Sequence, residues 1–246
     1  MRNKSLIFSL LILVLTLSTL APALTAEDII RKRDDNEYIE TARAEMEMVI
    51  KSGRREMVKS MVILTDKENS LTEFTNPRDR GTKFLKRGDE LWMFFPDAED
   101  IVKISGHMLN QGMMGSDFSY QDLLESDKLT DLYHFEIIGE EVVDGRPAYV
   151  LEGIAREGKE VAYYRRKSWI DKERFVGIKE ELYARSGRLL KVMTVLELEE
   201  IEDRWYPVRS VMEDKLRRDT STEVILKVLE FNPDIVEGTF TLENLR

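Results

Sequence analysis

The sequence predicts a mainly β (α+β) fold, an incomplete antiparallel β-barrel of about eleven strands. Short runs rich in Val, Ile, Phe and Thr recur over residues 56–104 and again over residues 134–231. Turn signals such as Asp144-Gly145 separate these runs, and no helical pattern lies between them, so neighbouring strands are expected to be antiparallel. A sheet with this many strands rarely stays flat, so we expect it to curl into a partial barrel.

The N-terminus has the layout of a secretory signal peptide. Arg2 and Lys4 precede the apolar run Leu6–Leu17, and small residues follow it. The run is shorter than the roughly 20 residues of a membrane span. We therefore predict a signal peptide over residues 1–26, cleaved after Ala23 or Ala26, with an uncleaved anchor as the alternative. Residues 27–246 are expected to form a single domain of about 220 residues.

The net charge and the absence of cysteine exclude several classes of binding partner and of covalent modification. The formal net charge is −10, and loss of the two basic residues of the signal peptide makes it −12. A protein this acidic is not expected to bind nucleic acid through a basic face. The sequence contains no cysteine, which excludes disulfides and a lipidated N-terminal cysteine. A periplasmic, non-lipidated protein is the predicted product.

Two segments depart from the strand pattern. The spacing of apolar residues in Ala26–Ile50 predicts a helix, with Thr25 or Asp28 at its start and Ser52-Gly53 at its end. Ser105–Lys128 is rich in glycine and methionine, and Ser119 followed by Asp122 resembles a capping box. We expect both segments to cover the open side of the barrel, the second as a mobile lid over an apolar cavity.

The lid region also contains the residues that we expect to bind a ligand. Methionine adapts to apolar partners of different shape, and neighbouring glycines permit movement. An ordinary, permanently packed core is the alternative interpretation of the same residues. The predicted lipid-binding residues are Trp92, Phe94, Met108, Met113, Met114, Phe118, Tyr120 and Leu123, and the predicted lid hinges are Gly106, Gly112 and Gly115.

Patterns typical of enzymes and metal sites are missing from the sequence. It contains two histidines, His107 and His134, and neither a Gly-x-Ser-x-Gly elbow nor a His-Glu-x-x-His motif nor a phosphate-binding loop. A lipid hydrolase would have to rely on Ser116, Asp117 and His107. We therefore predict a protein that is not an enzyme and that has no cofactor and no metal site.

The central block resembles the outer-membrane lipoprotein-sorting protein family, the LolA-like periplasmic proteins. The residues that carry the resemblance are Asn76-Pro77, Gly81-Thr82-Lys83, Trp92-Met93, Pro96-Asp97, Gly115-Ser116-Asp117-Phe118-Ser119, Tyr149-x-Leu151-Glu152, Trp169-Ile170-Asp171 and Trp205-Tyr206-Pro207. The resemblance covers nearly all of the chain after the signal peptide.

This resemblance implies a half-barrel closed by helices over an apolar cavity. It also implies a carrier that shields the acyl chain of a lipid or lipoprotein while it crosses the envelope, with an inner-membrane transporter as a further partner. The alternative that it implies is an accessory or sensor module of an RND- or MMPL-type exporter. The archetypal carrier is thought to hold its lid with an arginine on an early strand, and none of Arg54, Arg55 and Arg80 can be matched to that arginine.

Overall fold

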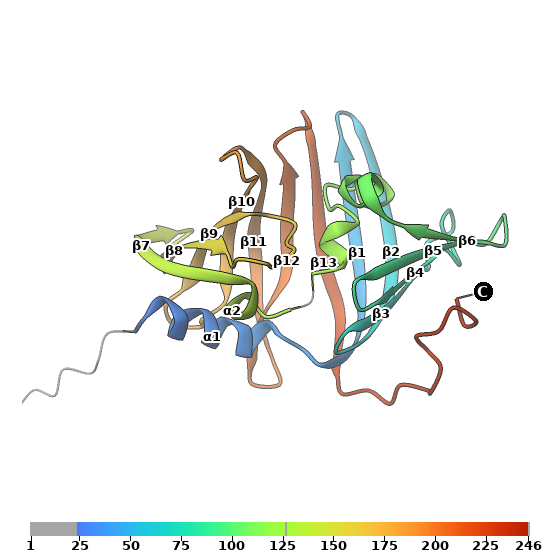
Figure 1. The fold of residues 1–246 in the computed structure, drawn as a ribbon, viewed down its shortest axis with the longest axis horizontal. Helices are drawn as coiled ribbons and strands as arrows, with labels where there is room; N and C mark the ends of the chain where they lie inside the picture. Colours follow the sequence, from blue (N-terminus) through green and yellow to red (C-terminus); the bar gives the residue numbers. More distant parts are fainter. Residues whose placement is uncertain (1–23, 126, 246) are drawn as a thin grey trace, which may run out of the picture.

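The computed structural model describes residues 24–125 and 127–245 (Figure 1). Almost all of the predicted signal peptide lies outside the described residues, so its cleavage remains a prediction. Among the described residues, none of the helices has the length and hydropathy of a membrane span.

The strands of the described residues form one antiparallel sheet in the order β6-β5-β4-β3-β2-β1-β13-β12-β11-β10-β9-β8-β7. The predicted mainly β, incomplete barrel is confirmed, with thirteen strands in place of about eleven, and the sheet remains open. The strands are β1 (Thr41–Ser52), β2 (Arg55–Asp66), β3 (Asn69–Phe74), β4 (Lys83–Arg87), β5 (Glu90–Phe95), β6 (Asp100–Ile104), β7 (Tyr133–Val143), β8 (Arg146–Ala155), β9 (Arg165–Asp171), β10 (Gly177–Tyr183), β11 (Leu189–Ile201), β12 (Arg204–Asp214) and β13 (Thr220–Phe231).

The sequence explains the hairpins between these strands. β7 and β8 pair up to Val143 and Arg146, which leaves Asp144 and Gly145 as the two turn residues. Both have positive φ angles, 47° and 79°, as a two-residue hairpin turn with the right-handed twist of the strands requires. The predicted turn signal is thus the physical reason for this strand pairing.

The expected helix over Ala26–Ile50 is only half correct. The helix α1 (Ala26–Glu37) forms with a capping box between Thr25 and Asp28, but residues from Thr41 onward belong to strand β1. The spacing of Met46 and Ile50 fits a helix, yet Met46, Met48 and Ile50 also fall at every second position, as on one face of a strand. β1 pairs along its whole length with β2 and β13, and these two long ladders override the local preference for a helix.

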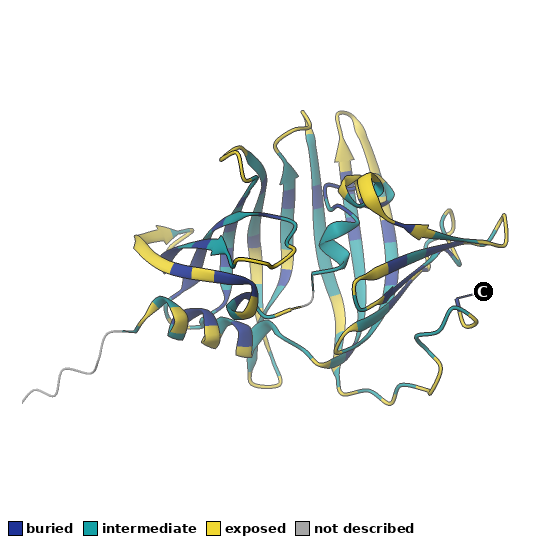
Figure 2. Cartoon of the chain, in the orientation of Figure 1, coloured by how far each residue is buried: buried dark blue, intermediate teal, exposed yellow. Residues whose placement is uncertain are grey.

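Two apolar clusters fill the inner face of the curved sheet. α1 and the short α2 (Leu129–Leu132) cover the half formed by β7–β9, where Ile29 and Ile30 pack on Leu151 and Ile170. The segment 105–125 covers the other half, and it runs between the two wings of the sheet (Figure 1). Figure 2 shows the buried residues concentrated on the strands behind these covers.

The outer face of β3–β5 has a cover of its own. Leu71, Leu85 and Phe94 pack against the segment 232–245 that follows β13, and Leu245 in this segment is fully buried. The inner and outer faces of this wing therefore have different apolar partners, the lid on one side and the C-terminal segment on the other.

Candidate functional site

The segment 105–125, here called the lid, packs on the inner face of β1–β6 and β13. It consists of three single-turn 3-10 helices, Gly106–Asn110, Met113–Gly115 and Gln121–Leu123, with one isolated bridge between Gly112 and Ser119. Its backbone-to-backbone hydrogen bonds join residues of the segment to one another, for example the Met113 N–H to the Phe118 carbonyl, so its position on the sheet depends on side-chain contacts. Segments of this kind are the ones that detach locally at low free-energy cost.

The lid and the strands beneath it share one methionine-rich apolar cluster. Four of its methionines are buried and four are partly buried, so it holds eight of the eleven methionines of the chain. Its buried members are Met48, Ile50, Met61, Phe74, Phe84, Leu91, Met93, Ile104 and Met113, and the partly buried methionines are Met46, Met57, Met108 and Met114. Unbranched thioether side chains repack more easily than branched ones, which makes this half of the interior deformable.

Six of the eight residues predicted to bind lipid lie in this cluster, namely Met108, Met113, Met114, Phe118, Tyr120 and Leu123. Trp92 and Phe94 do not join them, because both face the C-terminal segment on the outer side of the sheet. Side chains alternate between faces along a strand, so Leu91 and Met93 of β5 face the lid instead. The prediction chose the right strand, β5, but it chose the side chains of that strand that point away from the lid.

A first polar anchor holds the middle of the lid to β13. Asp117 is 2% exposed and accepts hydrogen bonds from the hydroxyls of Thr220 (2.6 Å) and Thr222 (2.7 Å). Its backbone N–H donates to the Thr222 hydroxyl at 2.9 Å. The Arg217 guanidinium donates to the carbonyl oxygen of Ser116 at 2.8 Å. Two hydroxyls of β13 and one cation of the connection that precedes β13 thus hold a short turn of the lid.

A second polar anchor holds the end of the lid to β9 and β11. Asp122 accepts hydrogen bonds from the Tyr163 hydroxyl (2.6 Å) and from Nζ of Lys191 (2.7 Å). The Asp122 carboxylate also accepts the backbone N–H of Ser119 at 2.6 Å, which confirms the predicted capping box. Burial is the main cause that raises the pKa of Tyr163, and the neighbouring Asp122 carboxylate raises it further. The phenol therefore keeps its proton and donates the hydrogen bond.

Glu125 completes the second anchor by pairing with a buried arginine. Its carboxylate contacts Nη2 of Arg166 and accepts the backbone N–H of Ala162 at 2.9 Å. Arg166 also contacts Glu180 at 3.1 Å through Nη1. Burial opposes the charge of Arg166, but Glu180 and Glu125 together hold the pKa of this guanidinium above its ordinary value. A charged arginine inside the half-barrel therefore depends on a lid carboxylate.

The predicted hinge glycines differ in what they do. Gly115 has a φ of +86°, which side-chain-bearing residues rarely adopt, and Gly106 is also left-handed. At Gly112, a Cβ would lie 2.5 Å from the carbonyl oxygen of Ser116. Gly112 is therefore required for the close packing of the lid on itself, while Gly106 and Gly115 set its turns. Their role as hinges remains a prediction.

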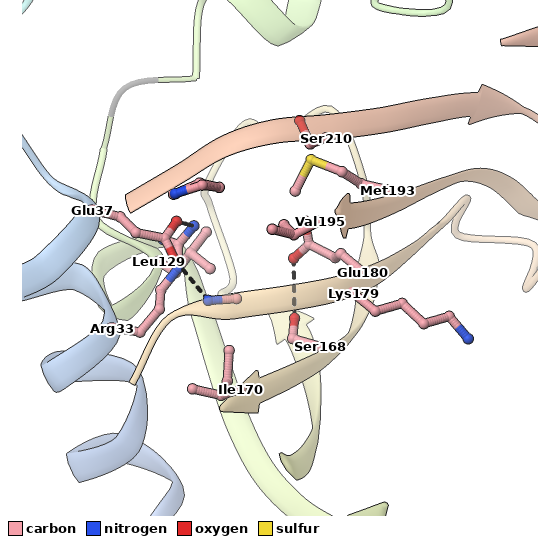
Figure 3. Close-up of a pocket in the computed structure, with 12 residues that line it drawn as sticks. Arg33, Glu37, Leu129, Ser168, Ile170, Lys179, Glu180, Met193, Val195 and Ser210 are labelled. Atoms are coloured by element: carbon pink, nitrogen blue, oxygen red, sulfur yellow. Dashed lines mark hydrogen bonds and ion pairs between the residues drawn. The ribbon is translucent and has the colours of Figure 1, made fainter. Parts of the chain in front are cut away.

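A small cavity lies under α1, in the other half of the inner face (Figure 3). Its volume is about 40 Å³, enough for a water molecule or two and far too small for an acyl chain. Arg33 and Glu37 form an ion pair at one end, and Glu180 and Ser168 are joined by a 3.0 Å hydrogen bond at the other. Burial raises the pKa of Glu37 although Arg33 opposes this.

The side chains of the imagined hydrolase have other roles. The Ser116 hydroxyl bonds to the backbone of Phe118, Asp117 binds Thr220 and Thr222, and His107 is exposed on the lid. Among the described residues, no group of three or more acidic or histidine side chains is placed to hold a metal ion. Arg166 and Lys191 were not among the residues predicted for the site, and the structure buries both of them on strands β9 and β11.

Comparisons with known proteins extend this geometry. A family model with the description "Uncharacterized protein" matches residues 66–246. A DUF1329 family protein from Desulfovibrio piger has 26% sequence identity and a TM-score of 0.81, over 89% of this chain and 97% of that one. A domain named for outer membrane lipoprotein sorting, from Vibrio parahaemolyticus, has 26% identity and a TM-score of 0.77 over 89% and 97%.

A LolA superfamily protein from Nitrosomonas europaea has 25% identity and a TM-score of 0.75, over 90% of this chain and 100% of that one. This chain belongs to the LolA-like family of outer-membrane lipoprotein-sorting proteins. No curated protein matches it. In this LolA-like protein Arg166, Lys191 and Arg217 bind the lid, and all three lie in the second half of the chain. The early arginines Arg54, Arg55 and Arg80 are exposed.

Proposed function

We propose that this LolA-like protein is a periplasmic carrier that shields an acyl chain of a lipid or lipoprotein between the lid and the inner face of β1–β6. The observation that carries the proposal is the concentration of eight methionines where the lid meets the sheet. A permanent core is usually built from branched side chains with fixed rotamers, whereas methionine suits a surface that repacks around a flexible ligand. The similar domain named for outer membrane lipoprotein sorting and the similar LolA superfamily protein support the same function.

The lid acts as an internal substitute for the ligand. Met113 is buried against the strands, and Met108, Phe118 and Leu123 pack beside it. Burial of an acyl chain stabilises the complex by about 0.8 kcal/mol per methylene, so a chain of about ten methylenes supplies about 8 kcal/mol. This energy offsets part of the apolar contacts and polar anchors that the lid loses when it opens. The ligand is held by buried area, and no catalytic group is needed.

A second candidate is an accessory or sensor module of an exporter. The observation that favours it is that the lid already fills the inner face with its own side chains. In that case the cluster is a permanent core, and a stable membrane-protein partner is expected. The two functions differ in one measurable property, the uptake of lipid by the isolated protein.

Two adjacent substitutions on β2 test the carrier function. Met57 is partly buried against the lid, whereas Val58 is 49% exposed on the opposite face of the same strand. The protein and its Met57→Glu and Val58→Glu variants are incubated with phosphatidylglycerol, and bound lipid is counted by native mass spectrometry. We expect Met57→Glu to lose bound lipid and Val58→Glu to retain it. Equal occupancy in both variants, or no uptake by the unsubstituted protein, would contradict the carrier function.

A further inference from the structure

Two cations are buried where the lid ends on the sheet. Arg166 is 6% exposed and Lys191 is 7% exposed, and they lie on β9 and β11 of the inner face. Isolated charges are costly to bury, so such groups are retained only with counter-ions or ligands. Here the counter-ions are Glu125 for Arg166 and Asp122 for Lys191, both supplied by the lid.

Opening of the lid would leave this pair of cations undercompensated. With the lid closed, the carboxylates of Asp122, Glu125 and Glu180 face Arg166 and Lys191, which gives two positive and three negative charges. Withdrawal of Asp122 and Glu125 leaves two cations and the single carboxylate of Glu180. The Nε of Arg166 is buried and has no hydrogen-bond acceptor among the described residues even in the closed state. The cluster therefore has unused capacity to bind an anion.

The cationic pair adjoins the apolar cluster. Phe118 of the lid packs both on the methionine-rich cluster and on a smaller cluster that contains Tyr163, Leu182 and Met212. Tyr163 also donates a hydrogen bond to Asp122, so its ring lies beside the polar anchor and its hydroxyl belongs to it. A ligand with an apolar tail and an anionic head would find both parts of its site next to each other once the lid moves.

We propose that Arg166 and Lys191 form the headgroup site of the carrier and select acyl ligands with an oxyanion head, a phosphate or a carboxylate. The lid carboxylates of Asp122 and Glu125 occupy this site in the closed state, as the lid methionines occupy the acyl site. Arginine binds such oxyanions through paired N–H donors, and lysine adds a point charge. This inference rests on the proposed carrier function, and it names the class of lipid that the carrier binds.

The test compares lipids with identical acyl chains and different heads. The purified protein is incubated separately with palmitoyl-oleoyl phosphatidylglycerol, with the zwitterionic phosphatidylcholine and with the uncharged diacylglycerol, and bound lipid is counted by native mass spectrometry. Oleate replaces the phosphate by a carboxylate, and inorganic phosphate supplies the free anion. We expect phosphatidylglycerol to be preferred about tenfold over diacylglycerol, as for one charge-assisted contact. Phosphatidylcholine, whose phosphate is balanced by the choline cation of the same head, should bind between the two.

Lys191→Met removes one cation and keeps an unbranched side chain that is only one heavy atom shorter. We expect this variant to bind phosphatidylglycerol and diacylglycerol equally. The control is Lys227→Met, because Lys227 is half-exposed on β13 and pairs with Glu47 away from the lid. Glu125→Gln, on the lid, is a second variant that keeps the proposal testable if Lys191→Met does not fold. It weakens the closed state, and it should bind more phosphatidylglycerol than the unsubstituted protein.

The possible outcomes separate this inference from the carrier function. Equal binding of all three glycerolipids would overturn the headgroup site and leave the carrier function intact. No binding of any lipid would overturn both. A rise in Tm with inorganic phosphate alone that is lost in Lys191→Met, without any preference among the lipids, would assign the cations to a free anion and overturn the assignment to a lipid head.

Discussion

Removal of the Asp117 carboxylate should release the lid without unfolding the sheet. Asp117→Ala abolishes the hydrogen bonds from Thr220 (2.6 Å) and Thr222 (2.7 Å). Hydrogen bonds to a charged group contribute about 1.5–3 kcal/mol each. Relief of the burial of the carboxylate offsets part of this loss. We expect the lid to open with about 2–3 kcal/mol less free energy, which makes the open state about 30- to 150-fold more populated.

Amide hydrogen exchange followed by mass spectrometry measures this effect. The amides of the lid that report on opening include those of Met113 and Tyr120, which bond to Phe118 and Gln111 within the lid. Their exchange should accelerate in Asp117→Ala, while peptides from β1 and β2 should exchange as before. Asp97→Ala, in the exposed turn between β5 and β6, is the control.

Two results would refute this reasoning. Unchanged exchange over residues 105–125 would mean that the polar anchor does not hold the lid. Equal acceleration in the lid and in β1–β2 would mean that the lid unfolds only with the whole protein and is part of a permanent core.

Three further predictions follow from the contacts described above. Gly112→Ala places a Cβ within 2.5 Å of the Ser116 carbonyl and should destabilise the lid by about 1–3 kcal/mol, seen as faster exchange of residues 105–125, with Gly139→Ala as a control in open space. Although burial opposes it, the hydrogen bonds from Lys59 and Asn76 lower the pKa of Asp79 below 3.8, so its stabilising contribution is full above that pH and is lost as the pH falls through the lowered pKa. The difference in free energy of unfolding from Asp79→Asn, measured with urea, should therefore shrink below pH 3.8, and a constant difference would contradict the ion pair. Ala21-Pro22-Ala23 fits the small-x-small cleavage rule better than Leu24-Thr25-Ala26, so the intact mass of the secreted protein should correspond to a chain that starts at Leu24 and keeps the Thr25 cap of α1. A mass that corresponds to a start at Glu27 would contradict this prediction.

The strand content of the fold was predictable because turn chemistry is local. Asp144-Gly145 and Ser119–Asp122 specify their turn and cap from a few residues, and both formed as expected. The secondary structure of Thr41–Ser52 was not predictable in the same way, because its spacing of apolar residues fits a helix as well as a strand. Its long pairings with β2 and β13 decide the outcome, and those partners are distant in the sequence.

The location of the candidate site was predictable from the sequence, but the side chains that face it were only partly predictable. The lid and its methionines were located from composition, but the orientation of β5 was not. One residue of register separates Met93 under the lid from Phe94 under the C-terminal segment. Arg166 and Lys191 were missed because a charged residue in a strand is normally a solvent-facing residue. Only the tertiary position of the lid carboxylates reveals that these two cations face inward.

The lipid content of the protein as the cell makes it is the most direct test of the carrier function. The secreted protein is purified without detergent, its mass is measured under native conditions, and the sample is then extracted with organic solvent. We predict a discrete added mass that passes into the organic phase as a lipid with an anionic head. A protein that carries no added mass, and that gains none after incubation with envelope lipids, would contradict it and would make the methionine-rich cluster an ordinary core.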